Sequence, residues 1–200
     1  MPSPAQTKYL GGLETARSIR AAVSDYRLRP MPRRQSQAFA HAALASLVAS
    51  WDAYLNELVV NFYTVTACPG DPAFHSLHSI AQSESANICK RFNTPNWENA
   101  RDLLLRTTGF EPTPCWVWPA RHMAGPAVRE RLNEILRVRH AFAHGLGIPS
   151  YSWNRTPTGR VRLNNSVLRD VESFFNNLVR RTDDGMKSHI ASRFGGTSPW

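Results

Sequence analysis

The chain has 200 residues, of which 42% are hydrophobic and 20% are charged. This composition is typical of one globular domain with its own core, and it excludes a disordered chain, a coiled coil and two full-sized domains. The 24 Lys and Arg residues, nearly all Arg, outnumber the 15 acidic residues and give a formal net charge of +9. This charge favours a phosphate-bearing polyanion as partner, although an Arg-rich codon usage would give the same excess of arginine.

Membrane insertion, export and metal binding are not expected from the sequence. The longest apolar stretch, residues 42–55, is interrupted by Asp52 and is too short to span a bilayer, and the N-terminal residues lack the apolar core of a signal peptide. The cysteines (Cys68, Cys89, Cys115) are odd in number and form no Cys-x-x-Cys pair, which argues against a disulfide framework and a zinc knuckle. We therefore expect a cytoplasmic protein without a metal or other cofactor.

The first half of the chain predicts two helices. The first spans about residues 7–26, and an Arg-rich linker with two prolines, residues 27–34, follows it. The second, residues 36–64, carries the strongest helical pattern, with polar and small residues opposite an apolar stripe. Trp51 and Tyr54 are expected to be core aromatics rather than surfaces that stack on bases. The stripe consists of Leu44, Leu47, Val48, Trp51, Leu55, Leu58, Val59 and Phe62, and the opposite face of Ser46, Ser50, Ala53 and Asn56.

Further helices are predicted at residues 75–92, 96–107 and 126–144, and from about residue 166 onward. Thr94 or Asn96 is a candidate cap, and Gly145 directly follows the helix that has Pro126 in its first turn. The fold class is therefore all-α, an antiparallel bundle of four to five helices with an irregular loop or short hairpin before the last helix. We expect residues 1–35 to form an N-terminal helix and basic linker, 36–190 the helical domain, and 191–200 a disordered tail.

Arg139 is the most unusual residue of the predicted helix 126–144. At about 100° per residue, the helical wheel places Arg139 about 20° from Val128, within an apolar stripe that is expected to be buried. A guanidinium cannot be buried without partners, so Arg139 should meet an acid, carbonyl groups, a subunit interface or a phosphate. The other members of the stripe are Leu132, Ile135, Phe142 and Ala143.

His140 and His144 lie one helical turn apart on the flank of this stripe, and His144 occupies the last turn, where the helix dipole favours imidazolium. An imidazole that holds or releases a proton beside a phosphate-binding Arg is what metal-free cleavage of a phosphodiester requires. The plainer alternative is a buried Arg held by a carboxylate, with the histidines as cap and filler. A zinc site is disfavoured because a third ligand and the Glu of His-Glu-x-x-His are missing.

The stretch RVRHAFAHG, residues 137–145, resembles the Arg-polar-x-x-x-His motif of the HEPN superfamily. The segment LASLVASWDAYLNELV, residues 44–59, resembles the second helix of the branch called RiboL-PSP-type HEPN. FNTPNWENARDLL, residues 92–104, and the order of the helices are also similar to that branch. The resemblance spans most of residues 36–185.

The resemblance implies a metal-independent endoribonuclease that acts as a homodimer, with two motifs facing each other across one cleft. Arg139 would bind the scissile phosphate, His144 would transfer a proton, and His140 would fill a polar position that is more often Asn or Asp. Attack by the ribose 2′-hydroxyl would leave a 2′,3′-cyclic phosphate, with a pH profile in the imidazole range. Many such proteins are toxins or antiviral-defence effectors, which implies an antitoxin or defence-system partner. The alternatives are an inactive HEPN module that binds RNA, nucleotide or a protein partner, and a purely structural bundle.

The remaining candidates carry weaker signals. Asp52 could pair with Arg139 or line the cleft, or be an exposed acid on its helix. The arginines outside the motif could form a positive rim for an RNA backbone, or be scattered solvated charges. The other histidines lack partners at ligand spacing, and the cysteines are expected to be inert. The rim candidates are Arg33, Arg34, Arg155, Arg160 and Arg162, and the other histidines are His41, His75, His78, His122 and His189.

Overall fold

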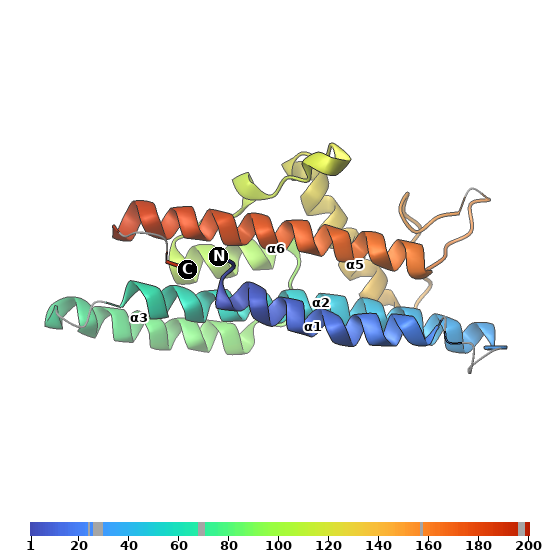
Figure 1. Cartoon of the computed structure of the whole chain (residues 1–200), viewed down its shortest axis with the longest axis horizontal. Coiled ribbons are helices and arrows are strands. Elements are labelled where there is room, and N and C mark those ends of the chain that lie inside the picture. Colours follow the sequence, from blue (N-terminus) through green and yellow to red (C-terminus); the bar gives the residue numbers. More distant parts are fainter. Residues whose placement is uncertain (24, 26–29, 68–70, 157, 196–198) are drawn as a thin grey trace.

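The protein is an all-α bundle, as predicted. The structure is a computed structural model that describes residues 1–200 except 24, 26–29, 68–70, 157 and 196–198. Helices α1, α2, α3 and α6 run along the long axis of the molecule, and α5 crosses them obliquely (Figure 1). The described residues form α1 Pro4–Ala22, α2 Arg33–Thr66, α3 Pro72–Arg91, α4 Trp97–Thr108, α5 Gly125–Ala143 and α6 Asn165–Phe194, with two single 3₁₀ turns, η2 Thr113–Cys115 and η3 Pro119–Arg121.

Helix α2 is the centre of the bundle. The apolar stripe predicted from the sequence is buried, and Trp51 and Tyr54 are fully buried core aromatics, as expected. Their rings stack at a centroid distance of 5.6 Å, and the Trp51 indole N–H donates to the carbonyl of Pro95 at 3.0 Å. The predicted polar face of this helix is not a solvent face throughout, because Ser50 is buried.

Helix α1 covers that face, so the predicted division at residue 35 is not a structural boundary. A Cβ added to Gly12 would lie 2.7 Å from the Ser50 hydroxyl, which shows how closely α1 and α2 approach. Glu172 of α6 holds the other side of α1 through ion pairs with Arg17 at 2.8 Å and Arg20 at 2.6 Å. The described residues therefore form a bundle of six helices, where four to five were predicted.

A buried carboxylate, Asp183 of α6, joins the start of the chain to the core. The side chain of Asp183 is 3% exposed and accepts hydrogen bonds from the backbone N–H of Ser3 at 3.1 Å and from the Ser3 hydroxyl. The Tyr54 hydroxyl also donates to it, at 3.5 Å. Trp200 is partly buried against the same core, and α6 continues to Phe194, so the prediction of a disordered tail from residue 191 is wrong for these residues.

The chain between α5 and α6 is irregular, in agreement with the predicted loop or short hairpin. Arg155 and Val161 form an isolated antiparallel bridge, and the backbone N–H of Arg162 donates to the carbonyl of Asn154 at 2.7 Å. Asn164 then caps α6 by accepting from the backbone N–H of Val167 at 2.9 Å. This loop therefore ends close to the start of α6, at the end of the molecule where α2 also begins (Figure 1).

Candidate active site at the end of α5

Helix α5 ends where the sequence predicts, at a glycine that adopts a left-handed conformation. Gly145 has φ +65°, and the backbone N–H of Leu146 donates to the carbonyl of Ala141 at 2.8 Å. The backbone N–H of His144 donates to the carbonyl of His140 at 3.1 Å. Together these bonds form a glycine-terminated cap that fixes the last turn of the helix and the three side chains of the motif on it.

The predicted burial of Arg139 is wrong. Arg139 is exposed, and so are Phe142 and Ala143, which the sequence had placed in the same buried stripe. The angular position is correct, since Val128, Leu132 and Ile135 on that face are 0% exposed. Toward its end α5 buries a different face, because Val138 and Ala141 are buried there while Arg139, Phe142 and Ala143 are exposed. Arg139 is therefore a solvent-accessible cation rather than a core residue. The nine ion pairs found between described residues do not include it.

Arg131, two turns earlier, is the arginine that α5 buries. Its side chain is paired with Asp170 at 2.7 Å and lies over the Trp153 ring at 4.3 Å from the centroid. Burial lowers the pKa of the Arg131 guanidinium to about 10, although the charge of Asp170 opposes the shift. A buried arginine held by a carboxylate was the plainer alternative considered for Arg139, and the structure assigns it to Arg131. The sequence pattern missed this residue because it lies at the edge of the apolar stripe.

Asp52 lies on the α2 surface that faces Arg139. Burial raises the pKa of the Asp52 carboxyl, and a hydrogen bond from Asn56 and the positive charge of Arg139 oppose that rise. The two charged groups are thus electrostatic neighbours without a direct ion pair. Of the roles expected for Asp52, the structure favours a half-buried acid beside Arg139 over an exposed acid on its helix. The guanidinium therefore keeps its hydrogen-bonding groups available to a ligand.

His140 and His144 form a pair of exposed imidazoles on the other flank of the same turn. Their ring centroids are 4.2 Å apart and the planes are inclined by 44°. The side chain of His140 also lines a groove of about 560 Å³ between α5 and the start of α4. The groove has an apolar side, with Leu136 and Leu146, and a polar side that includes Asn96. His140 therefore lies in the lining of a surface groove with space for part of a ligand, and the ring of His144 is next to it.

His41 of α2 is a residue of this region that the sequence did not single out. Its ring stacks on Phe142 with a centroid distance of 3.7 Å and an interplanar angle of 2°. His41 is 3% exposed, its Nδ1 has no hydrogen-bond partner, and burial lowers its pKa to about 4. No pattern within α2 or α5 could reveal this contact, because it depends on how the two helices cross. The stack anchors the last turn of α5 to the central helix.

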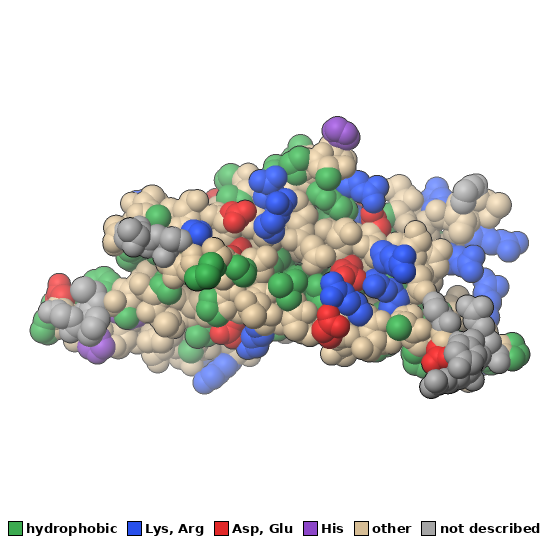
Figure 2. Space-filling view, viewed as in Figure 1, with side chains coloured by type: hydrophobic (Ala, Val, Ile, Leu, Met, Phe, Trp, Pro, Cys, Tyr) green, Lys and Arg blue, Asp and Glu red, His purple; other side chains and the backbone are tan. Residues whose placement is uncertain are grey.

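The arginines proposed as a positive rim divide into two groups. Arg33, Arg160 and Arg162 line a single pocket where α2 and α6 begin. Arg34 and Arg155 do not line it, and the Arg155 side chain donates instead to the Ser150 hydroxyl at 2.9 Å. Figure 2 shows Lys and Arg side chains gathered over this end of the molecule.

The other candidates are ordinary residues in the structure. The imidazole of His78 bonds to the Thr66 hydroxyl at 3.2 Å, and that of His189 to the carbonyl of Thr108 at 3.1 Å. Burial raises the pKa of the Cys89 and Cys115 thiols, which makes them poorer nucleophiles, while Cys68 lies outside the described residues. Within the described ranges, no three His, Cys, Asp or Glu side chains are arranged to bind a metal, and no helix has the length and hydrophobicity to cross a bilayer.

The fold and the site together define an all-α bundle with an exposed Arg-His-x-x-x-His helix end. Comparison with protein-family models, with curated proteins and with solved structures finds no match.

Proposed function

We propose that this chain is a metal-independent endoribonuclease of the HEPN type that cleaves RNA with Arg139 and His144, with His140 supporting them. One observation carries the proposal: an exposed guanidinium that makes no direct ion pair and a pair of imidazoles lie together at the capped end of one helix. A cation that can hold a phosphate and a group that can move a proton at neutral pH are the two requirements of this reaction.

The reaction needs no group other than these side chains and the RNA itself. The ribose 2′-oxygen attacks the adjacent phosphorus while an imidazole accepts the hydroxyl proton, and the bond from phosphorus to the 5′-oxygen breaks as that oxygen receives a proton. The products are a 2′,3′-cyclic phosphate and a free 5′-hydroxyl. Arg139 would bind the non-bridging oxygens, whose negative charge grows in the transition state. The second imidazole, His140, gives the site two groups that can exchange protons.

The positions of these groups support a site shared between two copies of the chain. Arg139 and His144 are five residues apart, which is about 140° around the helix, so they leave α5 on different flanks. Arg139 faces the Asp52 side, whereas His140, whose ring is next to that of His144, lines the groove beside α4. A second copy with its helix end opposed would bring Arg139 of one chain toward the histidines of the other. Phe142 and Leu146, which are 43% and 58% exposed, provide apolar surface for such a contact at this end.

The groove beside His140 is suited to a nucleotide next to the scissile phosphate. Its apolar residues, Leu136 and Leu146, could contact the face of a base, while Asn96 and Glu98 offer polar groups to the base edge. Unpaired bases are accessible to such a groove and paired bases are not. We therefore expect single-stranded RNA to be the preferred substrate.

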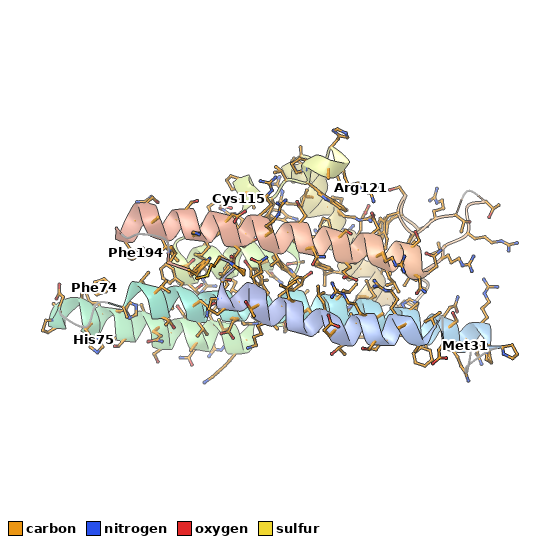
Figure 3. The ribbon with its side chains drawn as sticks, viewed as in Figure 1. Met31, Phe74, His75, Cys115, Arg121 and Phe194 are labelled. Carbon is orange, nitrogen blue, oxygen red and sulfur yellow. The ribbon has the colours of Figure 1, made fainter. Side chains whose placement is uncertain are left out.

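The test is cleavage of single-stranded RNA by the purified protein in the presence of EDTA. His144→Ala and Arg139→Ala should each reduce the rate by about 100-fold or more, since each removes a group that acts in the transition state. Both side chains are exposed, so the helical circular dichroism should not change. His75→Ala is the matched control, because His75 is an exposed histidine at the start of α3, at the far end of the molecule (Figure 3). Full activity in either motif variant, or complete inhibition by EDTA, would contradict the proposal.

The same assay distinguishes the second candidate, a non-catalytic module that binds RNA, nucleotide or a protein partner. The separation of Arg139 and His144 on two flanks of one helix favours that candidate if the chain acts as a monomer. Such a module would bind RNA without cleaving it at any protein concentration, whereas the proposed enzyme would gain activity as the concentration favours dimers.

A further inference from the structure

A second concave site lies at the end of the bundle where α2 and α6 begin. It is a pocket of about 580 Å³, enclosed by the first turns of α2, the irregular loop before α6 and the start of α6 itself. Arg33 comes from α2, and Arg160 and Arg162 come from the loop, so three separate guanidinium groups line one hollow. Met31, labelled in Figure 3, marks the end of the molecule where the pocket is found.

The charged side chains among the described lining residues of this pocket are all arginines. None of its described lining residues is acidic, and none of the ion pairs between described residues involves these three arginines. The remaining polar lining consists of hydroxyl and amide side chains that can donate hydrogen bonds, among them Ser36, Gln37 and Thr158. Three like charges held around one concavity repel one another, and a bound anion would relieve that repulsion.

The helix starts add to this preference for an anion. The N-cap residue of α2 is Pro32, which provides no side-chain hydrogen bond to the first turn. The first backbone N–H groups of a helix have no partner within the helix, and the helix dipole adds partial positive charge at the same place. These groups are secondary to the arginines, which distinguish this pocket from an ordinary helix start.

We propose that this pocket binds a terminal phosphate group, on the 5′ end of an RNA strand or on a free nucleotide. A backbone phosphodiester carries one negative charge, whereas a phosphomonoester carries nearly two and matches three guanidinium groups better. The described lining consists largely of cationic and polar side chains, which suit a phosphate group better than the face of a base. The identity of the ligand as RNA rests on the proposed function. The site would then make the enzyme sensitive to the phosphorylation state of its substrate.

The experiment compares two strands that differ only in the 5′ end. Fluorescence anisotropy is measured with a 3′-labelled, 2′-O-methylated RNA, which cannot be cleaved, bearing either a 5′-phosphate or a 5′-hydroxyl. Wild-type protein should bind the phosphorylated strand about tenfold more tightly, as expected for one additional charge-assisted interaction. Arg160→Glu with Arg162→Ala should bind the two strands equally. Both side chains are exposed on a loop, and circular dichroism checks that the fold is intact.

The control is Arg91→Glu with Arg193→Ala, which makes the same change of charge at two exposed arginines far from the pocket and should keep the tenfold preference. Equal binding of both strands by wild type, or an equal loss of preference in the control, would overturn the proposal.

Competition identifies the source of the phosphate. Displacement of the labelled strand by millimolar pyrophosphate indicates a free polyphosphate ligand, and displacement by phosphorylated strands alone indicates an RNA end. Because no probe is cleaved, the result does not depend on whether Arg139 and His144 catalyse a reaction.

Discussion

Acidification should destabilise the fold through His41, the residue that anchors the end of α5. Burial lowers the pKa of the folded His41 to about 4 from the ordinary value of 6.5, so the unfolded chain binds a proton that the folded chain does not hold between these pH values. Stability is therefore highest above pH 6.5 and falls as the pH drops toward 4. At 1.36 kcal/mol per pKa unit, the loss due to His41 is about 2 kcal/mol at pH 5 and about 3 kcal/mol at pH 4, relative to pH 7.

The assay is urea unfolding followed by tryptophan fluorescence at pH 7 and pH 5, for wild type and His41→Phe. A phenylalanine retains a ring that can stack on Phe142 and carries no titrating group. The free energy of unfolding of the variant should fall by about 2 kcal/mol less than that of wild type over this interval. The other acidic groups titrate in both proteins and cancel in the comparison. Parallel pH dependence of the two proteins would refute the assignment of His41 as a buried neutral imidazole.

Two further predictions concern the packing of α1. Gly12→Ala should lower the free energy of unfolding by about 1–2 kcal/mol, because the new Cβ would lie 2.7 Å from the Ser50 hydroxyl. Gly11→Ala should raise the free energy of unfolding by about 0.5–1 kcal/mol, because no atom lies within 4 Å of its new Cβ and alanine favours the helix. Thermal denaturation of the pair checks both signs, and a destabilised Gly11 variant would contradict the explanation. Asp183→Ala should lower the free energy of unfolding in urea by about 3 kcal/mol, since it leaves the Ser3 and Tyr54 donors without their acceptor. An unchanged unfolding midpoint would show that this buried carboxylate does not hold the start of the chain against the core.

Local features of the sequence were sufficient to predict the helices. The stripe of α2 repeats at helical spacing over many residues, and Asn96 and Gly145 mark helix ends through their own backbone and side-chain chemistry. Such signals act within a few residues and do not depend on the rest of the fold. The predicted segments therefore agree with the observed helices to within a few residues at their ends.

Features that depend on how far one helix extends beyond another could not be predicted. The helical wheel gives the direction in which Arg139 points, but not which face of α5 is buried at each turn. The burial of Arg139 was therefore wrongly predicted, and that of Arg131 was missed. The contacts of Ser50 with Gly12 and of His41 with Phe142 join helices whose relative placement is set by the whole bundle. The sequence offered Arg160 and Arg162 as candidates for a positive surface. Only the fold shows that they share a pocket with Arg33.

The most direct test of the proposed mechanism is complementation between two inactive chains. Arg139→Ala and His144→Ala chains with different tags are co-expressed, and the mixed dimer is isolated by successive affinity steps. If an arginine of one chain acts with the histidines of the other, each mixed dimer retains one intact site of two, and cleavage of single-stranded RNA should return to about half of the wild-type rate. A mixed dimer as inactive as either parent, alongside an active wild-type dimer prepared in the same way, would contradict a site shared across the helix ends.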